Sequence, residues 1–438
     1  MLNESIYKQR RKALLKHLTG EAMLITAAPE RTKSRDLHYP YAQDRNLFYL
    51  TGISDAKVAL LLNGTGFGPE SVLFVATPDP AKVRFDGSRL TLQSAKRTIA
   101  CDDFKSYESL AQELPQFLTR AEVLNYSIGA NPEIDELVIR MFKSEVAPRA
   151  NFPHTLRDAR VLLSEMRFSK DRHEIKFMRK AAAITTQSFK ALAAALPSVT
   201  SEAHGAALLE SYFKKFGADS TAFSTIIASG KNATTLHHTP SQQAFPRNAL
   251  VLVDAGAEYQ GYAADLTRVF PASGRFNSRQ AEIYDLVLGA QDACIRAARP
   301  GVTLDQLHAL CVREITKGLI QLRIIRGPLD KAIKLKRYQK YYMHRTGHFL
   351  GLDTHDITPL NFQAKQAPLH GYTRKLPEGA VLTIEPGLYF DASDRDLPSE
   401  FRGIGIRIED DILITKRSAE VLTAAMPKKR SDIESLFR

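Results

Sequence analysis

The sequence predicts a mixed α/β fold in two parts, and three observations lead to this prediction. The chain has 438 residues, which is more than one ordinary domain holds. Up to about residue 160, short apolar runs alternate with helical segments. Beyond that point, acidic residues enter the predicted strands. We therefore expect a first domain over residues 1–165 and a catalytic domain over residues 166–438.

In the first part, we expect one helix and two buried strands near the start of the chain. Residues 4–18 place Leu14, Leu15 and Leu18 on one face of a basic helix. Residues 58–62 and 71–76 are short apolar runs bounded by glycine or proline, which is typical of buried strands. Few candidate catalytic groups occur among these residues, so the first part is expected to support rather than perform the chemistry.

In the second part, helices and strands alternate. Apolar spacing predicts a long helical region over residues 166–196, and a second helix over 279–298 that stops at Pro300-Gly301. Thr303 and Gln306 then form a capping-box signature for the next helix. Between these helices we expect strands over residues 249–254, 261–270, 380–385 and 403–415.

The composition excludes several classes of protein. With 44% hydrophobic and 25% charged residues, the chain is neither disordered nor collagen-like. No apolar run approaches the roughly 20 residues of a membrane span, and the first residues turn charged where a signal peptide would become apolar. The three cysteines form no CxxC pair. A reduced, cytoplasmic setting is therefore expected, with no membrane partner.

The net charge of +12 is concentrated in one segment. Residues 313–345 hold ten Lys or Arg residues against only Glu314 and Asp330. Such a basic stripe can bind phosphates. Proteins that bind single-stranded nucleic acids space aromatic residues along such a segment, and this segment lacks that spacing. No DNA-binding motif accompanies it either, so we interpret it as a solvated helix face and loop. A nucleic-acid partner is not expected.

Four predicted strands each direct one carboxylate away from an apolar face, because successive side chains of a strand alternate between faces. Burying four carboxylates without compensation is too costly, and two compensations are open. One is ion pairing with arginines such as Arg268 and Arg407; the other is a hard-cation site for Mn, Mg, Co or Zn. The four carboxylates are Asp254, Asp265, Glu385 and Glu409.

Histidines gather near these strands and favour the metal site. The segment 342–356 contains His344, His348 and His355 among turn-forming glycines, and the pair His237-His238 precedes the first acidic strand. A single histidine is usually a hydrogen-bonding residue of the fold. Five of twelve histidines in two short segments make that interpretation weak.

The ordered motifs of the second part resemble those of the pita-bread metallopeptidases, which include methionine aminopeptidase, prolidase and aminopeptidase P. The stretch Tyr39 to Gly52, Tyr-Pro-Tyr-Ala-Gln-Asp-Arg-Asn-Leu-Phe-Tyr-Leu-Thr-Gly, is similar to the first domain of aminopeptidase P. The resemblance implies a creatinase/aminopeptidase P-like α/β domain followed by a pita-bread domain. The motifs are Leu-His, Val-Asp-Ala-Gly, Ala-Asp-Leu-Thr-Arg, Gly-His-Phe-Leu-Gly-Leu-Asp-Thr-His-Asp, Thr-Ile-Glu-Pro-Gly-Leu-Tyr and Gly-Ile-Gly-Ile-Arg-Ile-Glu-Asp-Asp.

The resemblance also implies two divalent metal ions, with Mn²⁺ expected and Co²⁺ or Zn²⁺ as alternatives. In it, Asp265 and Glu409 bridge both ions, and Glu385 is a ligand that also accepts a proton from water. The complete ligand set is Asp254, Asp265, His348, Glu385 and Glu409.

By the same resemblance, His237 and His355 contact the peptide and stabilise the tetrahedral intermediate, whereas His344, Tyr389 and Arg407 line the pocket of the second residue. His237, His344, His355, Glu385 and Arg407 are thus the expected catalytic residues. The chain departs from the family pattern in having His238 and Arg345 where Tyr and Gly are expected, and in having no tryptophan.

The expected reaction is the release of the N-terminal residue from peptides with proline in second position. A prolidase that cleaves Xaa-Pro dipeptides is the first alternative. A non-catalytic pita-bread module that binds protein or nucleic acid is the second, although no ligand is lost. A homo-oligomer, dimer or tetramer, is expected from the family.

Overall fold

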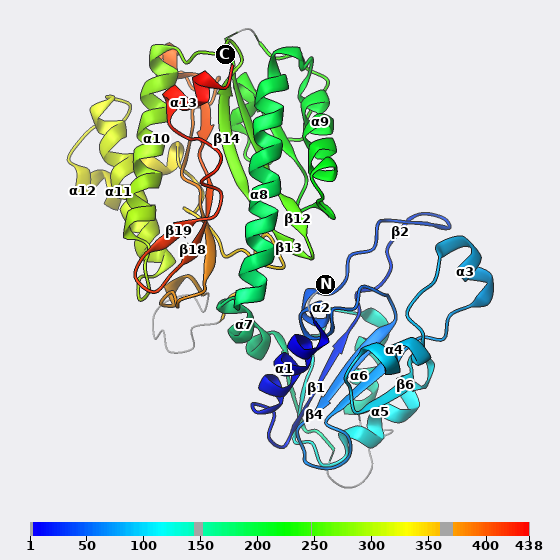
Figure 1. Cartoon of the computed structure of the whole chain (residues 1–438). Coiled ribbons are helices and arrows are strands. Elements are labelled where there is room, and N and C mark those ends of the chain that lie inside the picture. Colours follow the sequence, from blue (N-terminus) through cyan, green and yellow to red (C-terminus); the bar gives the residue numbers. More distant parts are fainter. Residues whose placement is uncertain (1–2, 144–151, 247, 360–370, 438) are drawn as a thin grey trace. The chain divides into compact units, whose positions relative to one another are not determined.

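A computed structural model of the chain describes residues 3–143, 152–246, 248–359 and 371–437 (Figure 1). The chain forms two compact units, Met1–Met166 and Arg167–Arg438, and each contains helices and sheets. The mixed α/β class predicted from the sequence is confirmed. None of the helices in the described ranges has both the length and the apolar character needed to cross a membrane.

The first unit is built on a six-stranded mixed sheet with the strand order β6-β5-β4-β1-β7-β8. β1 pairs antiparallel with β4 and parallel with β7. Every residue of β4 is buried, as expected for a central strand covered on both faces. The strands are β1 (Glu21–Thr26), β4 (Val58–Asn63), β5 (Ser71–Val75), β6 (Asp103–Ser106), β7 (Val123–Asn125) and β8 (Thr155–Arg157), with a separate hairpin of β2 (Thr32–Ser34) and β3 (Leu37–His38).

Helices cover both faces of this sheet. Leu114 of α5 and Val138 of α6 pack with Leu24 of β1 in one apolar core. The alternate residues Met23 and Leu60 are fully buried as well, and α1 and α2 contact β4 and β1. The helices are α1 (Glu4–Leu15), α2 (Arg45–Thr51), α3 (Pro80–Asp86), α4 (Leu92–Thr98), α5 (Leu110–Leu118) and α6 (Pro132–Phe142).

The second unit places small antiparallel sheets between two sets of long helices (Figure 1). α8 packs on β12, β13 and β14, and α9 packs on β10, whereas α10 packs on β15, β16 and β17 and is itself covered by α11. The strands are β9 (Ser220–Thr221), β10 (Ile226–Ser229), β11 (Leu250–Ala255), β12 (Ala257–Tyr259), β13 (Tyr262–Ala263), β14 (Leu266–Pro271), β15 (Val381–Ile384), β16 (Gly387–Tyr389), β17 (Gly405–Arg407), β18 (Asp410–Ile414) and β19 (Ala419–Val421).

The helices of the chain beyond residue 159 follow the predicted pattern with one difference. The long helical region expected over 166–196 is two helices, because Asp171 caps a new helix by accepting hydrogen bonds from the backbone of His173 and Glu174. The capping box of Thr303 and Gln306 is confirmed. The helices are α7 (Arg160–Phe168), α8 (Arg172–Ala195), α9 (Glu202–Lys215), α10 (Ser278–Ala297), α11 (Leu304–Gln321), α12 (Leu329–Lys334) and α13 (Arg430–Ser435).

Two of the predicted strands are interrupted where they carry a carboxylate. The strand expected over 261–270 is split into β13 and β14, and the strand expected over 403–415 into β17 and β18. In the first gap, the backbone N–H of Asp265 donates to Asp411 Oδ2 at 3.1 Å instead of to a neighbouring strand. In the second gap, the N–H of Glu409 donates to the carbonyl of Thr267 at 3.1 Å. These two hydrogen bonds therefore fix the backbone of Asp265 and of Glu409 where the strands are interrupted.

The basic segment 313–345 covers part of α11, all of α12 and the following loop. Most of its cations are exposed, as expected for a solvated face. Arg313 pairs with Asp330 at 3.0 Å, and Lys340 pairs with Asp394 at 2.8 Å.

Candidate metal centre

Asp254 and Asp265 come from two neighbouring strands of the second unit. Asp254 lies on β11 opposite Thr267 of β14, and Asp265 directly precedes β14. Between them the chain passes so close to itself that a Cβ atom at Gly256 would lie 1.6 Å from the carbonyl oxygen of Ala264. Only glycine fits there. This close passage brings both carboxylates to the wall of one cavity.

His348 and Glu385 are held next to each other by backbone hydrogen bonds. The N–H of Thr383 donates to the carbonyl of His348 at 2.8 Å, and the N–H of Glu385 donates to the carbonyl of Thr346 at 2.7 Å. A Cβ atom at Gly347 would lie 1.9 Å from the Thr383 carbonyl oxygen, so this approach also requires glycine. As a result, His348 Nε2 lies 3.8 Å from Glu385 Oε1.

Glu409 reaches the same place from the gap between β17 and β18. The hydroxyl of Thr267 donates to Glu409 Oε2 at 2.8 Å, and Arg268 Nη1 donates to the Glu409 carbonyl at 2.6 Å. Alternation along the sequence puts Asp265 and Thr267 on the face opposite Leu266, and Leu266 is buried in the core. The sequence does not predict that the threonine orients Glu409, because strand alternation carries no information on contacts between distant strands.

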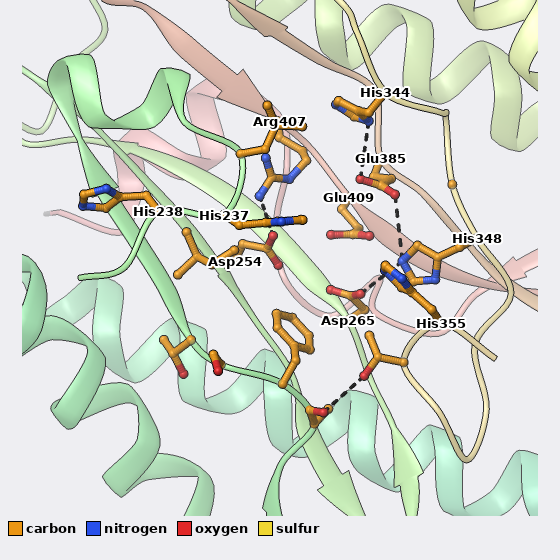
Figure 2. A pocket seen from close by; sticks show the side chains of 18 of the residues that line it. His237, His238, Asp254, Asp265, His344, His348, His355, Glu385, Arg407 and Glu409 are labelled. Atoms are coloured by element: carbon orange, nitrogen blue, oxygen red, sulfur yellow. Dashed lines mark hydrogen bonds and ion pairs between the residues drawn. The ribbon is translucent and has the colours of Figure 1, made fainter. Parts of the chain in front are cut away.

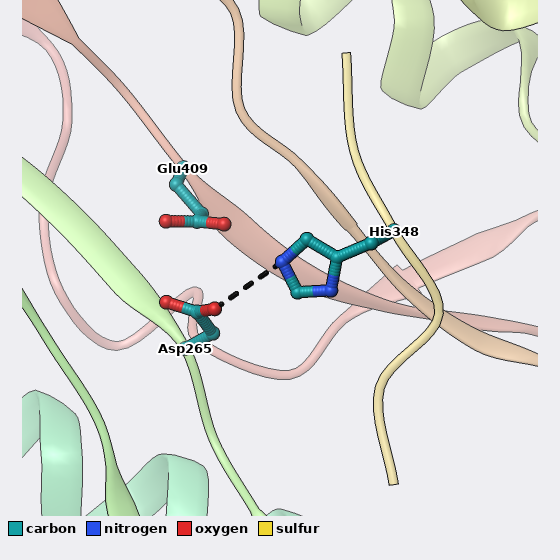
Figure 3. A group of neighbouring side chains, drawn as sticks. All are labelled: Asp265, His348 and Glu409. Atoms are coloured by element: carbon teal, nitrogen blue, oxygen red, sulfur yellow. Dashed lines mark ion pairs between the residues drawn. The ribbon is translucent and has the colours of Figure 1, made fainter. Parts of the chain in front are cut away.

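Asp265, His348 and Glu409 bring one ligand atom each within 4.8 Å of one another (Figure 3). His348 Nε2 lies 3.4 Å from Asp265 Oδ2. The other ring nitrogen, Nδ1, lies 3.1 Å from the carbonyl oxygen of Phe349. A proton on Nδ1 satisfies that carbonyl and leaves the Nε2 lone pair facing the carboxylates. An imidazole nitrogen among carboxylate oxygens is a donor set for a divalent cation.

The buried carboxylates carry more negative charge than the surrounding side chains balance. Burial, followed by repulsion from neighbouring carboxylates, raises the pKa of Asp265 and of Glu409, and burial raises the pKa of Glu385 to about 7. The Oδ1 atoms of Asp254 and Asp265 are buried and accept no hydrogen bond within the described part of the chain. Divalent cations would supply the missing positive charge and occupy these lone pairs, so the residues present fit metal ions.

Ion pairing with arginine accounts for only part of this charge. Arg407 Nη2 donates to Asp254 Oδ2 at 2.5 Å, and Arg407 Nη1 donates to the Tyr389 hydroxyl at 2.9 Å. Arg268, the other arginine considered from the sequence, pairs with Asp410 at 2.7 Å instead. Arginine pairing therefore explains one carboxylate of the four and leaves the metal interpretation as the better one.

A cavity of about 900 Å³ opens onto these carboxylates (Figure 2). Every residue that lines it belongs to the second unit. The volume is large enough for several amino-acid residues of a peptide. Its charged and histidine lining residues are His237, His238, Asp254, Asp265, His344, Arg345, His348, Asp353, His355, Glu385, Arg407 and Glu409.

His344 is a neutral base held between two polar groups. Its Nε2 lies 2.9 Å from the Tyr389 hydroxyl, and its Nδ1 lies 2.7 Å from the Arg345 carbonyl oxygen. Burial and the nearby Arg407 charge lower the pKa of His344 to about 4. Tyr389 is only 2% exposed, does not belong to the residues that line the cavity, and hydrogen-bonds with both His344 and Arg407. Its geometry is that of a residue that orients both of them.

The remaining histidines occupy different environments. The ring of His355 lies 4.2 Å from the ring of His348, and burial lowers the pKa of His355. The ring of His237 faces the carboxylates beside Asp254, whereas the ring of His238 points away from them (Figure 2). His238 Nε2 contacts Glu202 Oε2 at 2.8 Å. The two adjacent histidines are thus turned toward different partners.

Two buried acids beside the cavity, Asp411 and Glu202, are not predicted from the sequence to take part in the site. Asp411 receives the N–H of Asp265, and Glu202 receives the side chain of His238. Asp411 belongs to a run of three acidic residues that begins at Glu409, and this run could have indicated that Asp411 lies near the site. Glu202 resembles an ordinary acidic residue in the first turn of a helix, so the sequence holds no signal for its contact with His238.

Comparisons with known proteins agree over almost the whole chain. The profile of metallopeptidase family M24 matches residues 176–416, and that of the aminopeptidase P N-terminal domain matches residues 7–125. The Xaa-Pro aminopeptidase of Escherichia coli K12 is 36% identical, with 98% of this chain and 97% of that protein covered. The Xaa-Pro aminopeptidase of Haemophilus influenzae is also 36% identical, with 99% and 97% covered.

The fold agrees with solved structures as well. Aminopeptidase P from E. coli with the inhibitor Pro-Leu superposes with a TM-score of 0.92 at 34% identity, covering 99% of this chain and 98% of that one. The structure of Pseudomonas aeruginosa aminopeptidase PepP gives the same TM-score, identity and coverage. The first unit thus has the fold of the aminopeptidase P N-terminal domain and the second the pita-bread fold, as the sequence predicts. The chain belongs to metallopeptidase family M24, with the domain arrangement of the aminopeptidases P.

Proposed function

We propose that the protein is a metal-dependent Xaa-Pro aminopeptidase, which releases the N-terminal residue from peptides with proline in second position. One observation carries this proposal: buried carboxylates and His348 converge on a cavity of about 900 Å³, with more negative charge than the protein balances. The similarity to Xaa-Pro aminopeptidases over 97% or more of both chains supports the substrate class.

Five residues are proposed to hold two divalent ions. Mn²⁺ is the proposed metal, with Co²⁺ and Zn²⁺ as alternatives, since carboxylate-rich sites accept all three. A structure of Zn-substituted E. coli aminopeptidase P with product is among the similar ones. When bound, the ions would lower the pKa of a water molecule and polarise the scissile carbonyl. The proposed ligands are Asp254, Asp265, His348, Glu385 and Glu409.

Glu385 is proposed to accept the proton of the attacking water. Its Oε2 atom lies 3.8 Å from His344 Nδ1 and its Oε1 atom 3.8 Å from His348 Nε2, so the carboxylate lies between the two imidazole rings. A carboxylate that is buried beside other acids takes up a proton more readily than an exposed one. It can then return that proton to the leaving imino nitrogen of proline.

His237 and His355 are proposed to act on the peptide. Both line the cavity, and neither belongs to the proposed ligand set. Because burial lowers the pKa of His355, its ring is neutral at physiological pH and can donate one N–H. An imidazole N–H directed at the scissile carbonyl stabilises the negative charge that develops on its oxygen.

His344, Arg407 and Tyr389 are proposed to form the pocket for the second residue. An Xaa-Pro bond has no N–H and a fixed φ angle, so recognition must rest on the shape of the ring rather than on a backbone hydrogen bond. The Tyr389 hydroxyl accepts a hydrogen bond from Arg407 and makes a second one with His344, which fixes both side chains as one wall.

The same proposal extends to the organisation of the protein. We propose that residues 166–438 carry the chemistry and residues 1–165 act as a separate N-terminal domain. The free cysteines, Cys101, Cys294 and Cys311, support a cytoplasmic setting. A homo-oligomer, dimer or tetramer, is proposed from the family.

Purified, Mn²⁺-loaded protein assayed on matched peptides tests the substrate class. We expect hydrolysis of Xaa-Pro-Yaa, with free Xaa as product, and little hydrolysis of Xaa-Ala-Yaa. Hydrolysis confined to the dipeptide Xaa-Pro would show a prolidase instead. Binding of nucleic acid without any peptide hydrolysis would favour the non-catalytic alternative.

A further inference from the structure

Glu202, the first residue of α9, accepts an unusual number of hydrogen bonds. Its side chain is fully buried. Six donors from four residues point at its two oxygens within 3.1 Å. A carboxylate has about four lone-pair sites, so this acceptor is saturated.

The two oxygens of Glu202 hold the two ends of one loop. Oε1 accepts from the backbone and hydroxyl of Ser229, both at 2.8 Å, and from Asn232 Nδ2 at 2.9 Å. Oε2 accepts from the ring of His238 at 2.8 Å and from the backbone and hydroxyl of Ser241 at 3.1 and 2.8 Å. The loop 230–240 therefore starts and ends on a single carboxylate.

His237 lies inside this loop, and its neighbours are the groups that Glu202 holds. Residues 236–240 line the cavity beside the carboxylates. His238 turns its ring away from the cavity toward Glu202, while His237 turns its ring into it (Figure 2). The two residues are consecutive in the chain and their rings point to different sides (Figure 2), so anchoring the ring of His238 on Glu202 also restricts where the ring of His237 can point.

The anchor is a charged group at the start of a helix. Burial alone would raise the pKa of Glu202, but hydrogen bonds from Asn232, His238, Ser229 and Ser241 lower it to about 2. A negative charge in the first turn of α9 is also favoured by the helix dipole. The carboxylate is therefore ionised under working conditions, and its hydrogen bonds are charge-assisted.

We infer that Glu202 is a positioning residue for the reaction: by holding both ends of the loop 230–240, it keeps the ring of His237 directed at the scissile carbonyl. This inference rests on the proposed function, since it assumes that His237 acts on the peptide. Glu202 itself does not line the cavity. Its effect on turnover is therefore indirect, and we assign that effect to the position of His237.

The test is a double-mutant cycle of Glu202→Gln with His237→Ala in the metal-loaded enzyme. Glutamine keeps the shape but loses the charge, and its NH₂ group faces donors. We expect Glu202→Gln to lower kcat by about 10- to 100-fold, as a misplaced catalytic group does, with KM and metal content changing less than about threefold. In the His237→Ala background, Glu202→Gln should lower kcat by less than about twofold.

Two comparisons separate positioning from a general effect on the fold. Glu174 is a matched control, since it is 2% exposed, also lies in the first turn of a helix, α8, and accepts hydrogen bonds from the Asp171 N–H at 3.0 Å and from the Tyr262 hydroxyl at 3.1 Å. Glu174→Gln should lower the melting temperature without lowering kcat. If Glu202→Gln yields too little folded protein, Ser241→Ala, which removes one donor to Oε2, should show the same dependence on His237 with a smaller loss.

The results also separate this inference from the proposed function. If His237→Ala lowers kcat but Glu202→Gln lowers it by the same factor in both backgrounds, the inference is wrong and the role of His237 stands. If His237→Ala leaves kcat unchanged, that proposed role fails together with the inference. Hydrogen exchange needs no activity: faster exchange of residues 229–241 in Glu202→Gln supports the anchor, and unchanged exchange overturns it.

Discussion

Arg407 and Asp254 form a buried ion pair at the edge of the candidate metal centre, with Nη2 of the arginine 2.5 Å from Oδ2 of the aspartate. The other aspartate oxygen, Oδ1, is buried without a hydrogen-bond partner in the described residues. The pair thus leaves one oxygen of Asp254 directed at the site. Through its contact with Oδ2, Arg407 connects Asp254 to the proposed proline pocket, because Arg407 also donates to the Tyr389 hydroxyl at 2.9 Å.

Replacing Arg407 by lysine should break the connection between Asp254 and Tyr389. A lysine ammonium cannot hold both Asp254 and Tyr389 in the fixed geometry of a guanidinium. We expect kcat/KM on Xaa-Pro-Yaa to fall about 100-fold while both metal ions remain bound. Steady-state kinetics with metal analysis check this. Arg430→Lys, in an exposed pair with Asp285, is the control and should be silent; an equally silent Arg407→Lys would remove the arginine from the pocket.

Asp265→Asn should abolish metal binding without harming the metal-free fold. Asp265 lies buried beside other carboxylates whose repulsion raises its pKa, so a neutral side chain there relieves charge. After chelation, the variant should melt at the wild-type temperature or above it. On addition of Mn²⁺ the wild type should gain stability and the variant should not, because ligand binding stabilises only the state that binds.

Activity of the Asp265→Asn variant should fall by orders of magnitude, and calorimetry with turnover measurements checks both statements. Full metal occupancy together with normal turnover would exclude Asp265 from the site.

The adjacent histidines should behave differently when each is replaced by alanine. His237 faces the carboxylates and His238 contacts Glu202. His237→Ala should keep both metals and the melting temperature but lose about 10²- to 10³-fold in turnover, the usual cost of an oxyanion donor. His238→Ala should lower the melting temperature and cost less turnover. Abolished turnover in His238→Ala with a silent His237→Ala would reverse the assignment.

The stability conferred by Glu202 should depend on pH in a defined direction. Its pKa in the folded protein, about 2, lies below the ordinary value of 4.5. The ionised carboxylate therefore stabilises the fold above pH 4.5, and this contribution disappears as the pH falls toward 2. Urea unfolding of the chelated wild type and of Glu202→Gln should show a difference in unfolding free energy that narrows as the pH falls from about 4.5 toward 2. A difference in unfolding free energy that does not change with pH would contradict this assignment.

Strand alternation in the sequence predicted much of the site. Alternation along residues 403–409 puts Arg407 and Glu409 on the face opposite Ile406. The structure has the two charged residues at the cavity and the isoleucine in the core. Alternation could not predict that the strands break next to Asp265 and Glu409, because those breaks depend on hydrogen bonds between distant segments.

The conformation of the loop that carries His237 could not be predicted from the sequence. A pattern of leucines or alternating residues reports which face is buried, but the loop 230–240 has no such pattern. Its shape depends on Glu202, which lies 35 residues before His237 in the chain and has the local sequence context of a helix-capping acid. Only the folded structure shows that one carboxylate receives both ends of the loop.

Metal content measured together with peptide hydrolysis tests the central claim most directly. Protein stripped with a chelator should lose hydrolysis of Xaa-Pro-Yaa and recover it on stepwise addition of Mn²⁺. We predict that activity saturates at two bound ions per chain, the proposed occupancy of a site with five ligands. Full activity in the metal-free protein, or no hydrolysis of Xaa-Pro-Yaa when two ions are bound, would contradict the account.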